Sequence, residues 1–211
     1  MSSLRQILAD HGPVLLLDAA SSRVTVGWLA ADEPARWISS EGEAGIEIFK
    51  NIEALGKSVN DAAAFLFCEG PGSVLGIRTV AMALRTWGVL KPRPVYTYCS
   101  LALVAHALGR TDLGVIADAR RDFWHHFQLG AGLRRVATAD LAGELATPDD
   151  FRHWTPLPSK VSLVPYVLAD LWARAPDADL IRATSAPDAF LHEDPSYATW
   201  TPQIHRAPAS R

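Results

Sequence analysis

The sequence predicts a mixed α/β protein built from two related units, in which helices cover largely buried strands. Short apolar runs alternate with longer segments whose apolar residues recur at helical spacing. The order along the first half is strand, strand, strand, helix, strand, helix, strand, helix. A second strand that ends in Asp-Ala then appears about one hundred residues after the first.

The first unit is expected to span residues 1–110. Its opening strand, residues 14–17, is a continuous apolar run that ends on Asp18, which is typical of a central strand buried on both faces. Residues 23–29 start a second strand close behind it, so the two are expected to form a hairpin. The other expected elements are strands at 36–38, 63–68 and 95–98, and helices at 43–58, 75–90 and 101–108, the last capped by Ser100.

The second unit is expected to span residues 111–211 and to be reduced. Residues 114–121 echo residues 15–21, and Asp118 occupies the position of Asp18. A strand at 123–129 follows, but beyond Gly130 prolines cluster and the pattern weakens. The remaining expectations are a helix at 162–175, a short strand near Tyr197, and an end that frays after about Arg206.

Composition indicates a soluble globular protein, because 49% of the 211 residues are hydrophobic and 20% are charged. The net charge of -3 provides no basic field for nucleic acid, so any such contact is expected to be local or to come through a partner. No apolar run is long enough for a bilayer, and residues 1–10 lack the apolar core of a signal peptide. Cys68 and Cys99 lie in apolar runs, as buried free thiols do in a reducing cytosol. We expect a cytoplasmic protein without a membrane anchor.

Residues 70–78 are the strongest candidate for a functional loop. They join a buried strand to a long helix, and the members of interest are Gly70, Pro71, Gly72, Ser73, Gly76 and Arg78. Backbone N–H groups at the helix start could face an anion or a partner carboxylate. A structural turn, a partner-facing loop and a phosphate-binding loop all fit the pattern, although it contains neither a GK[ST] nor a GxGxxG motif.

The sequence gives little support for a metal site or for a catalytic nucleophile. The seven histidines include no i,i+4 pair and no HExxH, and His125 and His126 point to opposite faces of a strand. No GxSxG elbow is present, and Ser73 has no identifiable base. We therefore predict no metal site and no catalytic residue.

Of the helices expected at 43–58 and 75–90, the second carries apolar residues on more than one face. Such a pattern fits either helices buried against the sheet or a helix pair that offers an apolar stripe to another subunit. The candidate partner residues are Phe49, Ile52, Met82 and Trp87.

Three motifs in order resemble the TsaB (YeaZ) family. Leu-Leu-Leu-Asp-Ala-Ala-Ser-Ser at 15–22 resembles the first strand and its Asp-Thr-Ser turn. Gly-Pro-Gly-Ser-Val-Leu-Gly-Ile-Arg at 70–78 is similar to the GPGSFTGLR signature, and residues 116–121 resemble the IDAR motif. Together they cover residues 14–129.

The resemblance implies the actin- and sugar-kinase-like (ASKHA) fold, with two RNase H-like lobes. It also implies a non-catalytic scaffold that pairs with a TsaD-like catalytic subunit to make N6-threonylcarbamoyladenosine (t6A) in tRNA. A TsaE-like ATPase would engage the pair, the same N-terminal helices could form a homodimer, and no cofactor would be required. The alternative is an ASKHA-type ATP-dependent small-molecule kinase or ATPase, and weak nucleotide binding stays open.

In ASKHA ATPases, acidic residues after the first strand of each lobe organise Mg²⁺ and phosphate beside glycine-containing turns. The turn after Asp18 is Ala-Ala-Ser-Ser and the turn after Asp118 is Ala-Arg-Arg, so an ATP-hydrolysing site is disfavoured. We expect both aspartates to accept Asx-type turn hydrogen bonds, with Asp118 paired to an arginine. Family members also carry Thr-Ser, Glu-His and Phe-Thr where this chain has Ala19–Ala20, Glu43–Ala44 and Val74–Leu75, and these changes remove polar groups.

Overall fold

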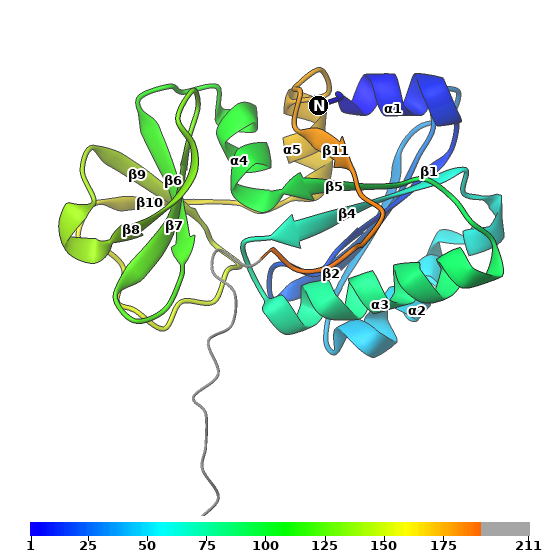
Figure 1. The fold of residues 1–211 in the computed structure, drawn as a ribbon, viewed down its shortest axis with the longest axis horizontal. Coiled ribbons are helices and arrows are strands. Elements are labelled where there is room, and N and C mark those ends of the chain that lie inside the picture. The colour runs from blue at the N-terminus through cyan, green and yellow to red at the C-terminus, as the bar shows by residue number, and fades with distance from the viewer. Residues whose placement is uncertain (191–211) are drawn as a thin grey trace, which may run out of the picture.

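The computed structural model describes residues 1–190, which form two sheets side by side (Figure 1). The first sheet has the strand order β11-β5-β4-β1-β2-β3. The bounds are β1 Val14–Asp18, β2 Arg23–Leu29, β3 Arg36–Glu41, β4 Ala64–Gly70, β5 Val95–Cys99 and β11 Ile181–Ala183. β1 pairs antiparallel with β2 and parallel with β4, while β3 and β11 are antiparallel edge strands. The strand expected near Tyr197 lies outside the described residues.

The second sheet repeats this arrangement with the strand order β10-β9-β6-β7-β8. The bounds are β6 Leu113–Asp118, β7 Phe123–Gln128, β8 Gly132–Ala137, β9 Glu144–Pro148 and β10 Val161–Val164. β6 pairs antiparallel with β7 and parallel with β9, as β1 does with β2 and β4. Counted from its opening strand, each sheet contains the order third, second, first, fourth, fifth, and the first sheet adds β11 beyond the fifth strand. The predicted internal repeat and the two RNase H-like sheets are therefore confirmed, with Asp18 and Asp118 at equivalent strand ends.

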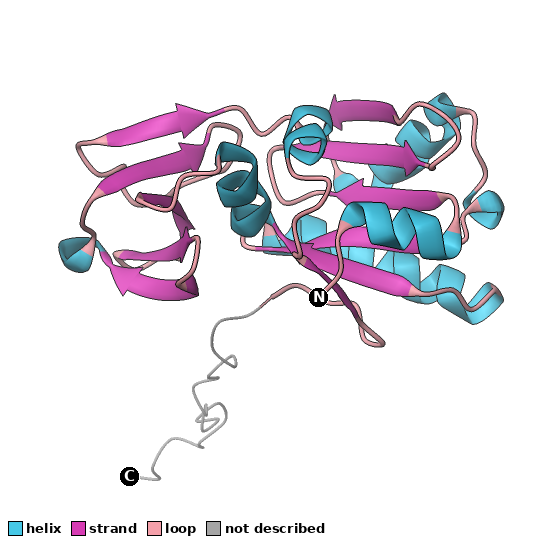
Figure 2. Cartoon of the chain, turned by 90° about the horizontal axis from the view of Figure 1, so that it is seen from above, coloured by secondary structure: helices cyan, strands magenta, loops and turns pink. Residues whose placement is uncertain are grey.

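The helices are distributed unequally between the two sheets. Their bounds are α1 Leu4–His11, α2 Ala44–Leu55, α3 Val74–Leu90, α4 Ser100–Leu108 and α5 Leu168–Arg174. α2 and α3 cover one face of the first sheet, α1 and α5 lie on the other, and α4 contacts strands of both sheets (Figure 1). The second lobe is almost free of helix (Figure 2), and within residues 113–164 the structure has only the 3₁₀ turn Thr138–Asp140. No helix among the described residues has the length and apolar character needed to cross a bilayer.

The main core lies on both faces of the first sheet. All five residues of β1 are buried, which is why this strand reads as a continuous apolar run. Each buried Leu side chain contributes roughly 1.5–3 kcal/mol relative to an exposed one. α4 buries Leu101–Ala105 between the two sheets. A second, much smaller cluster contains Ile116, Trp124 and Leu145. The first lobe therefore carries most of the hydrophobic stabilisation.

The structure differs from the predicted elements at the N-terminus and around Pro165. The N-terminal helix α1 was not predicted, although Ser3 and Gln6 form a capping box at its start. The helix predicted at 162–175 is wrong over its first half, where β10 runs to Val164 and α5 begins only at Leu168. Pro165 explains the break, because a proline disfavours helical backbone in the residue before it.

The chain returns to the first lobe after β10, whereas residues 111–211 were expected to form the second. β11 pairs antiparallel with β5, and Leu171, Trp172 and Ile181 join the main core. This edge of the first sheet had no other strand to pair with β5, so the returning segment covers it. Ser100 also differs from its expected role, since Cys99 is the N-cap of α4 and the Ser100 hydroxyl donates to the Pro71 carbonyl at 2.6 Å.

Candidate functional site

Asp18 is buried at the end of β1, with only 1% of its surface exposed, and both carboxylate oxygens are occupied. Oδ1 accepts the Ala20 N–H at 2.8 Å, which is the expected Asx turn. Oδ2 accepts the Tyr98 hydroxyl at 2.5 Å and the Tyr166 hydroxyl at 2.8 Å. Burial raises the pKa of Asp18, although the hydrogen bonds from Tyr98, Ala20 and Tyr166 oppose it. The carboxylate is thus fully engaged inside the protein.

Asp118 occupies the equivalent place in the second sheet but lies partly exposed. Its Oδ1 accepts the Arg120 N–H at 2.5 Å, again as an Asx turn. Its Oδ2 accepts N–H groups of Trp154 and Thr155, the latter at 2.7 Å. Burial works against its ionised form, but the backbone hydrogen bonds from Thr155, Arg120 and Trp154 outweigh it and lower the pKa. Backbone N–H groups thus supply its bonds, where an arginine side chain was expected.

The glycine turn between β4 and α3 packs directly on the Ala19–Ala20 turn. A Cβ on Gly76 would lie 2.3 Å from the Ala19 carbonyl oxygen, and a Cβ on Gly72 would lie 2.3 Å from that of Ala20. The Ser73 N–H donates to the Ala20 carbonyl at 2.7 Å, and the Ser73 hydroxyl caps α3. These contacts give the two glycines a packing role, because only a residue without a side chain fits there.

Arg78 forms an ion pair with Asp188 on the side of α3. Its Nε lies 3.5 Å from an Asp188 oxygen, and Arg85 Nη2 lies 3.5 Å from the other oxygen of the same carboxylate. The expected role of Arg78 toward an anion or a partner carboxylate stays a prediction.

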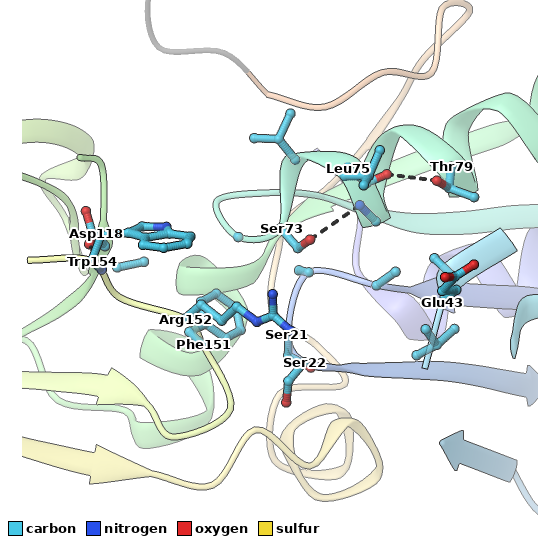
Figure 3. Close-up of a pocket in the computed structure, with 18 of the residues that line it drawn as sticks. Ser21, Ser22, Glu43, Ser73, Leu75, Thr79, Asp118, Phe151, Arg152 and Trp154 are labelled. Carbon is cyan, nitrogen blue, oxygen red and sulfur yellow. Dashed lines mark hydrogen bonds between the residues drawn. The ribbon is translucent and has the colours of Figure 1, made fainter. Parts of the chain in front are cut away.

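A cleft of about 850 Å³ separates the two lobes. Figure 3 shows the turn after Asp18 and the starts of α2 and α3 on one side, with Asp118, Phe151, Arg152 and Trp154 on the other. The Arg152 guanidinium points across the cleft toward the Ser21–Ser22 turn (Figure 3). The volume lies within the range of small-molecule sites. Asp118 borders this cleft, whereas Asp18 does not.

Backbone conformation in the β6–β7 turn is unusual. Arg120, Arg121 and Asp122 all have positive φ, at 62°, 54° and 63°. Left-handed backbone costs a residue with a side chain roughly 1–2 kcal/mol. The turn places the Arg120 guanidinium 5.8 Å from the centre of the Trp154 ring, at the edge of the cleft.

Few side chains among the described residues are arranged to bind a metal ion or to act as a nucleophile. Among residues 1–190, no group of three or more His, Cys, Asp or Glu side chains is arranged to hold a metal ion. His125 borders the cleft whereas His126 is buried, with the two on opposite faces of β7 as predicted. Burial raises the pKa of Cys68 and raises that of Cys99 to about 11, which makes both thiols poor nucleophiles at neutral pH.

An apolar face runs along α2 and α3 on the outside of the first lobe. Phe49 is 55% exposed and Met82 is 57% exposed, although both are large apolar side chains. The Phe49 and Trp87 rings meet edge to face at 6.2 Å, and Trp87 is half-buried between the helices. Ile46 and Leu75 are also exposed, at 50% and 80%. Ile52, expected on this face, is buried at 7% because it points into the sheet with Ile48.

Several residues of the site were missed from sequence. Tyr98 and Tyr166 lie 80 and 148 residues from Asp18, so no local pattern connects them to it. Trp154 and Arg152 lie in a loop without periodicity, so no sequence pattern pointed to them.

Comparison with known proteins identifies the fold class first. No protein-family model matches the chain, and no curated protein matches it either. Among solved structures, YeaZ from Pseudomonas aeruginosa shares 18% identity with a TM-score of 0.55, covering 76% of this chain and 89% of its own. An uncharacterized protein with similarity to peptidase YeaZ from the same organism gives 17% identity, a TM-score of 0.55, and coverage of 77% and 89%. This chain therefore has the two-lobed α/β fold of YeaZ, as the sequence resemblance implied.

Proposed function

We propose that this chain is a TsaB-like, non-catalytic scaffold that pairs with a TsaD-like catalytic subunit in the t6A modification of tRNA. Three ordered sequence motifs and the YeaZ fold support this assignment. In the proposed complex a TsaE-like ATPase engages the pair and tRNA is contacted only indirectly, which suits a net charge of -3. The proposed compartment is the cytoplasm.

The observation that carries the proposal is the exposed apolar face of α2 and α3. Phe49, Met82 and Leu75 are each more than half exposed, and together with Ile46 they line neighbouring helices. Soluble monomers rarely expose such contiguous apolar surface, and a helix pair can bury it against two helices of another subunit. The proposed occupant is the TsaD-like subunit, and a homodimer through the same face is the competing assembly.

The environment of Asp18 supports a non-catalytic role. An ASKHA-type phosphotransfer site needs a carboxylate that can reach Mg²⁺, but both Asp18 oxygens accept protein hydrogen bonds in a site that is 1% exposed. The neighbouring glycines Gly72 and Gly76 are used for packing against the Ala19–Ala20 turn. No cofactor is required by the proposed function.

One observation favours the alternative of an ATP-dependent small-molecule kinase or ATPase, namely the cleft of about 850 Å³ between the lobes. Calorimetry with Mg-ATP separates the two functions. The kinase alternative predicts tight, saturable binding that Asp118→Asn weakens. The scaffold proposal predicts weak binding or none, with no turnover.

Co-purification with the TsaD-like protein of the source organism tests the scaffold proposal. Phe49→Glu and Met82→Glu place a charge on the apolar face and are each expected to weaken the complex at least tenfold, by about 1.4 kcal/mol or more. Leu163→Glu is the matched control, because Leu163 is 62% exposed on β10 in the other lobe. If the two proteins do not associate, or if all three variants bind equally, the proposal is wrong.

A further inference from the structure

A short segment of the chain crosses the first lobe after β11. We call residues 184–190 the C-terminal strap. It is fixed at its two ends, where the Thr184 N–H donates to the Val95 carbonyl at 2.9 Å and the Phe190 N–H donates to the Glu69 carbonyl at 2.7 Å. Figure 1 shows it in orange, descending from β11 across β4. It therefore lies beside α3, the helix that carries part of the apolar face.

The middle of the strap is attached to α3 through one carboxylate. Asp188 Oδ1 lies 3.5 Å from Arg78 Nε, and Oδ2 lies 3.5 Å from Arg85 Nη2. Arg78 and Arg85 are seven residues apart and so share one side of the helix, two turns from each other. Met82 lies between them along the helix and is 57% exposed. The two guanidinium groups therefore border the apolar face on the side of the strap.

These contacts leave most of the binding capacity of both arginines unused. Each guanidinium offers five N–H donors and binds carboxylates best through two short parallel hydrogen bonds. Among residues 1–190 each has one ion-pair contact, at 3.5 Å, and the side chains of Arg78, Arg85 and Asp188 are 49%, 43% and 52% exposed. Exposed ion pairs of this length contribute little to stability. Asp188 is therefore a weak and replaceable partner.

The strap is anchored by two buried residues, Pro187 and Ala189, and packs incompletely on the protein around them. A cavity of about 190 Å³ lies under it, lined by Phe67, Glu69 and Arg182 together with strap residues. Glu69 and Arg182 form their own ion pair, so the strap does not supply a charge to them. The Asp188 side chain, which is exposed, can thus leave Arg78 and Arg85 while the buried Pro187 and Ala189 stay in place.

We propose that the strap is an internal competitor of the partner, in which Asp188 holds Arg78 and Arg85 until an acidic side chain of the TsaD-like subunit replaces it. This inference rests on the proposed function, since it extends the same apolar face with a cationic border. The partner surface it fits is an apolar helix pair flanked by Asp or Glu residues. Binding then releases the Asp188 carboxylate from α3.

Affinity measurements with the full chain and the TsaD-like subunit test the exchange. Asp188→Asn is expected to tighten binding two- to fivefold because it removes the competitor. The double variant Arg78→Gln/Arg85→Gln is expected to weaken binding fivefold or more and to reduce its salt dependence. Asp177→Asn is the matched control, because Asp177 forms a comparably exposed pair with Arg5. Unchanged or weaker binding by Asp188→Asn, or unchanged binding by the double variant, overturns the inference while leaving the proposed function intact.

Hydrogen exchange on the chain alone tests the same attachment without the partner. Asp188→Asn is expected to speed exchange of the strap amides, including that of Phe190, severalfold without affecting β1 or β4. Unchanged strap exchange would show that Asp188 does not hold the segment and would also overturn the inference. If the wild-type chain fails to bind the TsaD-like subunit at all, the proposed function fails and the competitor role falls with it.

Discussion

The two lobes share one strand order but place their equivalent aspartates in opposite environments. Asp18 is enclosed by the first lobe and bonded by two phenol hydroxyls, and burial raises its pKa. Asp118 borders the interlobe cleft and is bonded by backbone N–H groups, and these outweigh burial to lower its pKa. The first sheet is covered by helices on both faces, while the second sheet is contacted by α4 and otherwise by loops.

The shared strand order sets the position of each carboxylate, but it does not set the burial or the hydrogen-bond partners of that carboxylate. The elements packed over the end of the strand determine whether the carboxylate is buried as a hydrogen-bond acceptor or remains accessible to solvent. In this chain the first carboxylate is buried and fully hydrogen-bonded, which supports the proposal that the lobe binds a protein rather than a metal-nucleotide substrate.

The largest expected effect compares removal of the two carboxylates. Asp18→Ala leaves two buried phenol hydroxyls and the Ala20 N–H without an acceptor and should destabilise the protein by about 3 kcal/mol or more. Asp118→Ala should cost about 1 kcal/mol, because water can replace the acceptor at this partly exposed site. Urea unfolding of both variants measures the difference. Equal losses would contradict the contrast between the lobes.

A second comparison uses two glycines of the same helix. Gly76→Ala should destabilise the protein by about 2 kcal/mol, because the new Cβ would lie 2.3 Å from the Ala19 carbonyl oxygen. Gly88→Ala should stabilise it by about 0.5–1 kcal/mol, since no atom lies within 4 Å of the added carbon and alanine favours the helix. Thermal unfolding of the two variants is the measurement. If Gly76→Ala leaves the stability unchanged, α3 does not pack tightly on the turn after Asp18.

The pH dependence of stability should have opposite signs at the two aspartates. The raised folded pKa of Asp18 gives a contribution that is largest below its unfolded pKa of about 3.9 and is lost as pH rises through the folded value. The lowered folded pKa of Asp118 gives a contribution present above about 3.9 and lost as pH falls through the folded value. Between pH 7 and pH 3, the stability deficit of Asp18→Asn should therefore grow and that of Asp118→Asn should shrink. Urea titrations that show parallel trends would refute this.

The smallest expected effect concerns the strained turn of the second lobe. Arg121 is exposed with φ at 54°, and glycine tolerates this backbone without the cost borne by other residues. Arg121→Gly should stabilise the protein by about 0.5 kcal/mol, measured by thermal unfolding. A loss of stability would mean that the contacts of the Arg121 side chain stabilise the fold by more than its positive φ costs.

Local sequence patterns predicted β1 to β5 and α2 to α4, most clearly at β1 and β4, where burial on both faces leaves continuous apolar runs. They failed around Pro165, where a helix was predicted across β10 and α5. β8 and β9 of the second lobe are short, and their partners are set by the sheet rather than by alternation.

The site residues likewise include some that local sequence predicted and others that it did not. The Asx turns of Asp18 and Asp118 were predicted, since they depend on residues two positions away. The bond between Asp18 and Tyr166 joins residues 148 positions apart, and only the fold brings them together. Ile52 was assigned to the exposed face because helical spacing gives a stripe without saying which side meets the sheet.

The central claim, that this chain is the non-catalytic partner in t6A formation, is tested most directly by reconstitution. The TsaD-like and TsaE-like proteins of the source organism, with tRNA and the precursors of t6A, are assayed with and without this chain, and t6A is quantified by mass spectrometry of the digested tRNA. The account predicts t6A only when the chain is present, with strong loss for Phe49→Glu and normal yield for Leu163→Glu. Equal t6A formation in its absence would contradict the account.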